Sequence, residues 1–512
     1  MAMTAAIAII MSAPLALAPR SAQADELADL RANQQLLEQR LDQLAQIPGA
    51  GHLYQGPGGA KTAGATIVGG SFPRSFLIPG TDTSIRVGGA IRFHIKHNFN
   101  GANVHAVPAS STNFGNNGDI NGAPLHQHVA LVGGKLVKAG NPARSQGTDV
   151  TFFSPQQSKV NFETRTPTAW GEARTFMEFD WAGACSECAG SLRSTNSLHP
   201  RLRYAYATLG GLLGGQANSN FADPDAGVDS INFGGMTGSR GVTRIPQLRY
   251  TWALAPWGWP GAFSASVEAP ETESWLPTGG FRQSDSPNPT GGINPFKAAS
   301  PDVTFAWYIP QPWGHADFGA VVRPALQMKD GLAIDRTFTG WGLAFSGDYK
   351  PGWFGWKKDY ITWQFTGGDG VGRYLAGNTT MLALITNYPA VRPTLATVGN
   401  VRARTVWAWG GNTGYRHWWT PTLRSNVGFG ILHQDINNLG GADGFVCSGG
   451  VRFAGTGGCG LNKELVTSEV NLIWNPVPFA DLGVEYFWGH RVVLSNLKGD
   501  VNGIIGTFRV NF

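Results

Sequence analysis

The stretch Ser84-Ile-Arg-Val-Gly-Gly-Ala-Ile-Arg-Phe-His-Ile-Lys96 decides the fold, because its side chains change character at every second residue. The odd positions are apolar or glycine, and most of the even positions are basic: Arg86, Arg92, His94 and Lys96. A period of two predicts a β-strand with one apolar face and one polar face. The length of the run fits a strand that is tilted across a membrane.

The same alternation returns in further segments, most of which carry Val, Leu, Phe, Tyr or Trp on the apolar face. These segments are 159–165, 172–181, 201–208, 247–252, 315–323, 341–345, 361–365, 423–429, 469–474, 482–488 and 504–512. Short connections lie at 166–171, 210–211, 253–261, 309–314, 350–358, 418–421 and 475–480, and long polar ones lie between them. Seven short and eight long connections predict sixteen antiparallel strands, with both ends of the chain on the short-turn side.

Strands that cross hydrocarbon must pair without a free edge, since every backbone N–H and C=O needs a partner there. We therefore expect an all-β transmembrane barrel over residues 84–512, and the apolar alternation up to the terminal Phe512 is typical of bacterial outer-membrane barrels. Sixteen strands enclose a lumen that side chains cannot fill. Water must occupy this lumen, which explains the second, polar face.

The first 83 residues follow other rules. The apolar run 5–18 and the Ala-Gln-Ala at 22–24 predict a signal peptide over residues 1–24, removed before Asp25. Leucines spaced by three and four in residues 25–47 predict a short α-helical coiled coil, with an amphipathic helix on some other surface as the alternative. Residues 48–83 form a linker rich in Gly and Pro.

Composition excludes several classes of protein. Charged residues make up 14% of the chain, yet it holds 18 Trp and 28 Phe, which is unlike a disordered chain or an ordinary soluble enzyme. Loss of residues 1–24 leaves 38 Lys and Arg against 34 Asp and Glu. That excess is too small and too dispersed to indicate a nucleic-acid partner.

The polar faces of the strands carry more cations than anions, most of all in the first four strands. The basic residues expected to line the pore are Arg86, Arg92, His94, Lys96, Lys159, Arg165, Arg174, Arg201, Arg203, Arg249, Arg323 and Arg424. A cationic wall around water concentrates counter-ions, so we expect small anionic solutes to pass preferentially.

The third long connection, residues 217–245, is the candidate constriction. It contains Asn218, Phe221, Asp223, Asp225 and Asp229, and carboxylates facing wall arginines would create a transverse field. In the alternative interpretation this acidic loop is solvated outside the barrel or binds Ca²⁺ loosely.

The four cysteines form two local pairs, Cys185 with Cys188 and Cys447 with Cys459, so the oxidising cell envelope favours two loop disulfides. A redox or zinc half-site at the first pair is the alternative. His126 and His128 are interpreted as solvated loop residues. We expect neither a cofactor nor a metal.

Several motifs resemble the DcaP-like family of trimeric outer-membrane porins. They are Phe76 to Ser84, Gly215-Gln216 with Phe221 to Asp225, Gly368 to Tyr374, His417 to Thr420 with Leu423 to Ser425, and Asn471 to Pro478. The resemblance implies a sixteen-stranded homotrimer in outer-membrane lipid and lipopolysaccharide, a periplasmic coiled coil, and uptake of small anions, notably dicarboxylates. Where similar proteins carry an aromatic residue in the third loop, this chain has Asn218.

Three competing functions follow from other features. Ser425 with His417 suggests an outer-membrane hydrolase, although their spacing does not establish contact. A structural or adhesin-type barrel would have a closed lumen. Residues 368–372 partly match a dinucleotide-binding loop, but they follow a strand and open no helix. We expect a channel and no enzyme.

Overall fold

The computed structural model describes residues 69–100, 131–132, 135–136, 150–183, 199–231, 236–238, 240, 243–271, 274–276, 280–282, 296–329, 335–375, 383–386, 402–436, 462–493 and 498–512. The expected signal peptide, the coiled coil and most of the linker lie outside these ranges. So do the four cysteines, His126 and His128.

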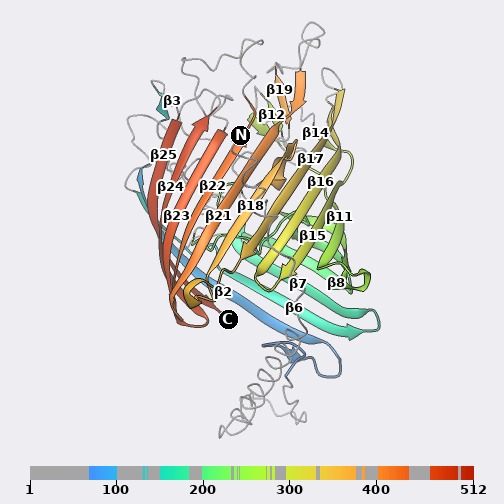
Figure 1. Cartoon of the computed structure of the whole chain (residues 1–512). Coiled ribbons are helices and arrows are strands. Elements are labelled where there is room, and N and C mark those ends of the chain that lie inside the picture. The colour runs from blue at the N-terminus through green and yellow to red at the C-terminus, as the bar shows by residue number, and fades with distance from the viewer. Residues whose placement is uncertain are drawn as a thin grey trace. The chain divides into compact units, whose positions relative to one another are not determined.

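Sixteen antiparallel strands close into a barrel (Figure 1). They are β2 (Ser84–Asn100), β6 (Lys159–Thr168), β7 (Gly171–Gly183), β8 (His199–Leu209), β9 (Leu212–Asn218), β10 (Arg244–Ala253), β11 (Ala262–Glu268), β15 (Asp302–Gln311), β16 (Gly314–Lys329), β17 (Asp335–Tyr349), β18 (Tyr360–Asp369), β21 (Trp407–Thr420), β22 (Leu423–Gln434), β23 (Asn462–Val477), β24 (Ala480–Val493) and β25 (Lys498–Asn511). The barrel closes because β2 pairs with β6 on one side and with β25 on the other.

Shorter strands lie beside the barrel strands or in the long connections. They are β1 (Phe76–Leu77), β3 (Leu131–Val132), β4 (Lys135–Leu136), β5 (Val150–Ser154), β12 (Ser274–Leu276), β13 (Gly280–Arg282), β14 (Phe296–Ala298), β19 (Ala383–Thr386) and β20 (Arg402–Thr405). Strand β5 continues the pairing of β6 along β2, so the chain between them is a local interruption of one long strand.

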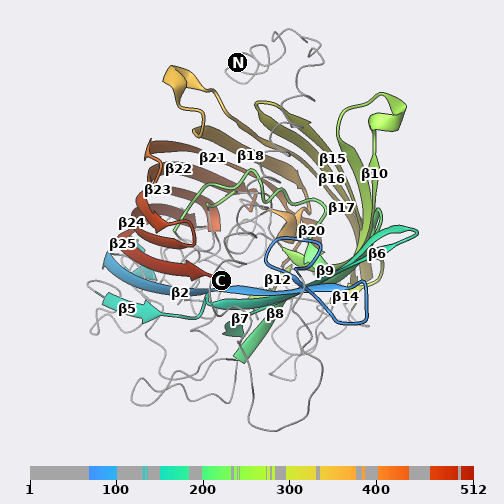
Figure 2. The ribbon, with the colours of Figure 1, turned by 90° about the horizontal axis from the view of Figure 1, so that it is seen from below.

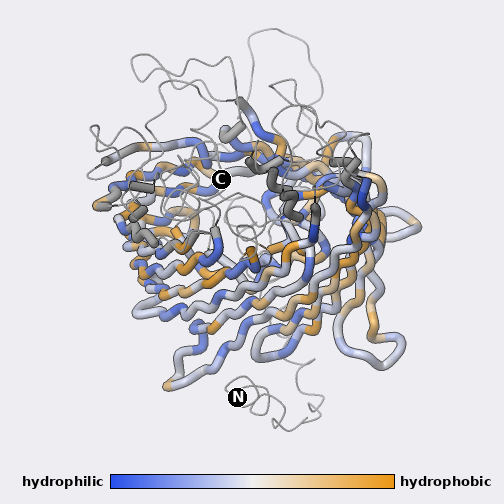
Figure 3. The backbone as a smooth tube through the Cα atoms, turned by 90° about the horizontal axis from the view of Figure 1, so that it is seen from above, coloured by the Kyte–Doolittle hydropathy of each residue, from blue (hydrophilic) through white to orange (hydrophobic). Residues whose placement is uncertain are grey.

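The two-residue period has the expected structural meaning. On β2, Val87 and Ile91 point outward and are exposed, whereas Ala90 and His94 between and beyond them are buried. Figure 3 shows hydrophobic and hydrophilic residues alternating along the strands. Exposed apolar side chains recur on most of the barrel strands, as expected of a surface that meets lipid.

Short turns join the strands at one end of the barrel and long connections join them at the other. The seven short turns agree in place with the sequence expectation, to within three residues at each end. Three of the long connections are L3 (residues 219–243), L4 (residues 269–301) and L6 (residues 370–406). None of the helices in the described part of the chain has the length and hydropathy to cross a membrane.

Candidate functional site

L3 lies inside the barrel, along the inner wall. Figure 2 shows this segment, drawn in green, running within the ring of strands. Its hydrogen bonds reach β11 from Ser219 and β18 from Arg240, and they continue to β23 and β24 from Ser230. The described residues of L3 are therefore attached across much of the wall and do not project from the barrel mouth.

The first attachment joins L3 to β16, β17 and β18. Asp223 accepts hydrogen bonds from His315 Nε2 at 3.0 Å and from Ser346 Oγ at 2.6 Å. Arg240 is fully buried, forms an ion pair with Asp317, and donates from Nε to the Phe221 carbonyl at 2.6 Å. These contacts replace the water that each charge would lose on burial.

The pKa of Asp223 follows from this setting. Burial raises the pKa, but the hydrogen bonds from His315 and Ser346 and the nearby charge of Arg240 outweigh burial and lower it below the ordinary aspartate value. Asp223 is thus an ionised anchor of L3.

The second attachment joins L3 to β21, β22 and β24. Asp229 accepts from Arg416 Nη2 at 2.6 Å and from Arg424 Nε at 2.8 Å. Two residues on, the backbone N–H of Ile231 donates to Glu485 at 2.6 Å. Arg416 and Arg424 of the wall therefore neutralise the negative charge of Asp229.

Glycines on the wall make room for L3. A Cβ added at Gly430 would lie 2.3 Å from the Thr237 carbonyl oxygen, and one at Gly414 would lie 2.8 Å from Val228. Only a residue without a side chain permits this close approach. The glycine-rich strands β21 and β22 are thus shaped to carry the loop.

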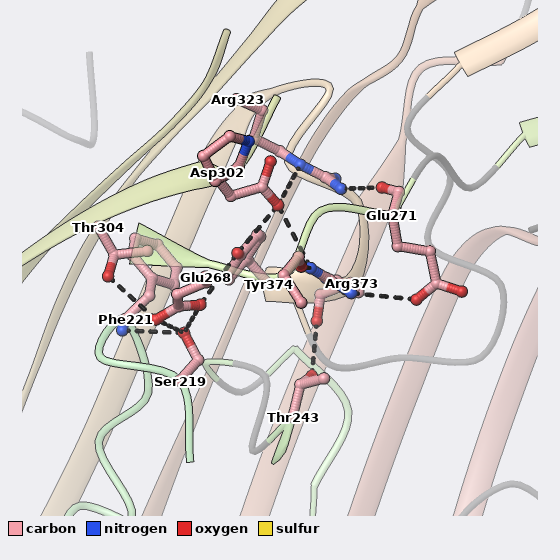
Figure 4. A network of polar contacts seen from close by, with 12 residues as sticks. Ser219, Phe221, Thr243, Glu268, Glu271, Asp302, Thr304, Arg323, Arg373 and Tyr374 are labelled. Carbon is pink, nitrogen blue, oxygen red and sulfur yellow. Dashed lines mark hydrogen bonds and ion pairs between the residues drawn. The ribbon is translucent and has the colours of Figure 1, made fainter. Parts of the chain in front are cut away.

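A polar network locks L3 to L4 and L6 (Figure 4). Glu268 accepts from Ser219 Oγ at 2.8 Å and from the Tyr374 hydroxyl at 3.0 Å, and Tyr374 also lies 3.0 Å from Asp302. Burial and the two carboxylates raise the pKa of Tyr374 well above its ordinary value. The phenol therefore stays protonated and serves as a donor.

Apolar side chains also hold L3 and L6 against the wall. Among the described residues, a buried cluster gathers Phe221 and Ile231 of L3, Val371 and Leu375 of L6, and inward residues of the strands such as Phe487. The two-residue period predicts a polar inner face, whereas these inward positions are apolar. The difference arises because the wall behind L3 and L6 meets protein and not water.

The arc formed by β2 and β6 to β8 has a different character. Five cations on it keep between 23% and 35% of their side-chain surface accessible although they point inward; they are Arg86, Lys159, Arg165, Arg174 and Arg201. Accessible inward charges mark the side of the lumen that is open to solvent.

The carboxylates of this arc are shared between several cations. Glu163 is fully buried and accepts from Arg86, Arg165 and Arg174, the last two at 2.8 Å. Asp180 accepts from Arg201 at 2.6 Å and from Arg203 Nη1 at 2.7 Å. One negative charge thus holds two or three guanidinium groups in place.

Basic and acidic residues are distributed unevenly among the barrel strands. Strands β2 and β6 to β10 carry ten Lys and Arg against four Asp and Glu. The other ten strands carry nine against eleven. The excess of positive charge is therefore confined to one side of the barrel.

Three aromatic rings lie among these cations. Phe176 packs against Tyr204 and Tyr206 with ring centroids 5.9 and 5.6 Å apart. Arg174 stacks over Phe176 at 5.6 Å, and Arg244 stacks over Tyr204 at 5.5 Å. These contacts hold flat apolar surfaces beside guanidinium groups.

Strict alternation would have turned the two tyrosines toward lipid. The pairing of β7 with β8 shifts between Glu178 and Phe179, so that Tyr204 lies opposite Glu178 and Leu202 lies opposite Phe179. This β-bulge adds one residue, Arg203, to β8. No residue type in the sequence marks the bulge, so the aromatic group was missed.

The remaining residues expected to line the pore divide in two. Arg92 and Arg249 are half-buried, as an accessible wall requires. By contrast, His94, Lys96, Arg203 and Arg424 are buried, and Arg323 is 0% exposed within the network of Asp302. Their burial corrects the expectation that these five residues line an accessible pore.

The candidate loop residues also separate. Phe221, Asp223 and Asp229 belong to L3 and hold it, and Asp225 is exposed. Asn218 is the last residue of β9, and its side-chain oxygen accepts from the Tyr204 hydroxyl at 3.0 Å. It is therefore a wall residue and not part of the loop.

The residues considered for hydrolysis lie at the short-turn end. His417 and Ser425 are cross-strand neighbours on β21 and β22. His417 Nδ1 lies 2.7 Å from Asp359, whereas the Ser425 hydroxyl accepts from Trp419 Nε1 at 2.7 Å. Within the described ranges, no group of three or more His, Cys, Asp and Glu could hold a metal ion.

Comparisons with known proteins agree with this geometry. Residues 74–316 match a family model described as Porin subfamily, and residues 451–512 match the model described as DcaP outer membrane protein. None of the curated proteins matches the chain.

A solved channel shows the same fold, and two further porins are similar to a lesser degree. The outer membrane channel DcaP of Acinetobacter baumannii is 20% identical, covers 87% of this chain and 100% of its own, and has a TM-score of 0.59. An anion-selective porin from Comamonas acidovorans is 8% identical over 84% of this chain and 100% of its own, with a TM-score of 0.46. OmpF of Salmonella typhi is 11% identical over 84% and 98%, with a TM-score of 0.43.

Proposed function

We propose that this chain, which has the porin fold and matches the Porin subfamily and DcaP outer membrane protein models in part, is an outer-membrane passive diffusion channel for small hydrophilic solutes with a preference for anions. The observation that carries the proposal is the cationic arc, in which inward arginines and a lysine stay accessible inside the barrel. A closed lumen would bury them.

The electrostatic argument has two parts. The arc has an excess of positive charge, which raises the local concentration of anions in a narrow, low-dielectric channel. The carboxylates of L3 oppose this excess only weakly, because Asp223 and Asp229 are paired with His315 and with wall arginines. The exposed Asp225 is the acid of L3 that faces solvent.

The same arrangement gives L3 the role of a constriction. A loop held from β11 to β24 narrows the lumen and leaves the cationic arc as the wall of the remaining path. Solutes then pass between L3 and the arginines of β6, β7 and β8.

Dicarboxylates suit this path best among small anions. Arg86, Arg165 and Arg174 share one carboxylate, and Arg201 and Arg203 share another, so each group retains donors for a passing carboxylate. A solute with two carboxylates engages neighbouring groups at once.

We further propose that the chain acts as a homotrimer, with residues 1–24 as the signal peptide and residues 25–47 as a periplasmic coiled coil. A parallel coiled coil of three helices would link the three barrels.

Planar bilayers test the channel. Purified protein in a KCl gradient is expected to give discrete current steps and a reversal potential that shows preference for chloride. Replacement of Arg92 and Arg174 together by Gln is expected to move the reversal potential toward the value of a non-selective channel. Absence of current would support a closed structural barrel, and cation selectivity would contradict the charge argument.

A further inference from the structure

The turn between β17 and β18 (residues 350–359) differs from every other short turn. It reads Lys-Pro-Gly-Trp-Phe-Gly-Trp-Lys-Lys-Asp. All seven short turns are described, and this is the one that contains Lys or Arg: Lys350, Lys357 and Lys358. We call it the Lys-Trp turn.

The tip of the Lys-Trp turn presents large apolar side chains to the outside. Trp353, Phe354 and Trp356 expose 52%, 88% and 44% of their surface. Phe354 also adopts a left-handed backbone conformation with φ of 53°, between Gly352 and Gly355, which are left-handed too. Such a conformation costs about 1 kcal/mol or more in a residue with a side chain. The fold thus holds a strained phenylalanine where it contacts no part of its own core.

The base of the turn, by contrast, is firmly held. Asp359 is buried and accepts from the Tyr415 hydroxyl and His417 Nδ1, each at 2.7 Å, and from the Trp418 backbone N–H at 2.9 Å. Trp356 packs edge-on against His417, with ring centroids 4.4 Å apart. A rigid base and an exposed apolar tip are what a protruding anchor requires.

The three lysines surround this tip and are exposed. Lys358 Nζ lies 5.1 Å above the Trp418 ring, so its alkyl chain follows an aromatic surface while its charge stays at the edge. Lys350 lies 3.7 Å from Asp348, whose other oxygen contacts His315, and half of the Lys350 side chain remains accessible. Asp348 belongs to β17, and the acid of the turn itself, Asp359, is fully engaged by its three donors.

From this placement we infer that the Lys-Trp turn is a binding surface for anionic phospholipid in the leaflet that the short turns face. Trp and Phe side chains insert at the boundary between headgroups and acyl chains, and lysines beside them attract anionic headgroups. The surface is continuous with the lipid-facing aromatic belt, to which Trp313 and Trp419 belong. Charge complementarity selects phosphatidylglycerol over a zwitterionic lipid.

Lipid titration of the full-length protein in a non-ionic detergent, read by native mass spectrometry, tests this inference. Wild-type protein is expected to retain phosphatidylglycerol more tightly than phosphatidylethanolamine. The variant K350Q/K357Q/K358Q is expected to bind phosphatidylglycerol at least about fivefold more weakly, with phosphatidylethanolamine unchanged. The variant F354S is expected to weaken both lipids.

A matched control removes three lysines from strands on the long-loop side, K297Q/K329Q/K463Q. It is expected to bind phosphatidylglycerol as the wild type does. Equal losses in the two triple variants, or no loss in the first, would overturn the inference. Resistance of the folded barrel to SDS reports that each variant is folded, and unchanged current steps separate this inference from the proposed channel.

Discussion

Phe221 of L3 packs edge-on against Tyr374 of L6, with ring centroids 5.6 Å apart and an interplanar angle of 80°, and both side chains are completely buried. The contact joins two long connections inside the barrel. It also shields the hydrogen bonds of Tyr374 to Glu268 and Asp302 from water.

The replacement F221A is expected to loosen L3. Loss of a buried phenylalanine lowers stability by about 3–5 kcal/mol. Most of this loss affects the packing of L3 against the wall and L6, and not the pairing of the strands. Single-channel recordings should then show larger and noisier current steps. The milder variant Y374F keeps the ring contact and loses only the hydroxyl, so its steps should be closer to those of the wild type. Identical, quiet steps in F221A would show that this contact does not position L3.

The replacement E163Q is expected to strengthen anion preference. Glu163 is the shared partner of Arg86, Arg165 and Arg174, which are all partly accessible, so loss of its charge leaves three guanidinium groups facing the lumen. The reversal potential in a KCl gradient should move further toward that of chloride. Glu172 is half-exposed near a turn, and E172Q should give a smaller change. A shift toward potassium in E163Q would contradict the role of the arc.

The replacement D229N is expected to release the second attachment of L3. It removes the charge that Arg416 and Arg424 share, at a cost of about 2–3 kcal/mol for hydrogen bonds to a charged group. Conductance should rise because the loop is held less firmly against β21 and β22. D225N removes the same charge from an exposed residue of the same loop, so its conductance should stay near that of the wild type.

The replacement D359N is expected to change the response of stability to acid. Burial raises the pKa of Asp359, but hydrogen bonds from His417, Trp418 and Tyr415 outweigh it and lower the pKa below the ordinary value of 3.8. A carboxyl group whose pKa is lowered on folding stabilises the fold above its unfolded pKa, and that contribution disappears as pH falls through the folded pKa.

The measurement for Asp359 is the temperature at which the barrel loses its resistance to SDS, followed from neutral pH down to about 3. The wild type should lose more stability than D359N over this range, since other carboxyl groups titrate equally in both. Parallel curves would show that Asp359 does not anchor the turn.

Much of the barrel could be predicted because its rule is local. A period of two and the alternation of short and long connections depend on neighbouring residues only, and they predicted sixteen strands and the position of β2 at Ser84. An inward third loop carrying Phe221 and Asp223 was one of the two interpretations of residues 217–245. Contacts across the lumen follow no local rule.

Contacts between residues far apart in the sequence therefore could not be predicted. Arg240 and Asp317 are 77 positions apart, and Tyr374 meets Glu268 over a separation of 106. Nothing in either segment indicates its partner. Parity alone placed Arg323 and Lys96 on the inner face, but parity does not tell whether water or another loop covers that face.

Arg203 is the extra residue of the β-bulge in β8. Because Arg203 lies unpaired in the bulge, the inward positions of β8 change from odd-numbered to even-numbered residues, so that Arg201, Arg203, Tyr204 and Tyr206 all face the lumen. One inserted amino acid thus adds flat aromatic rings to a strand that also presents guanidinium groups to molecules in transit. A channel with altered substrate range needs no new side chain, only a change in strand phase.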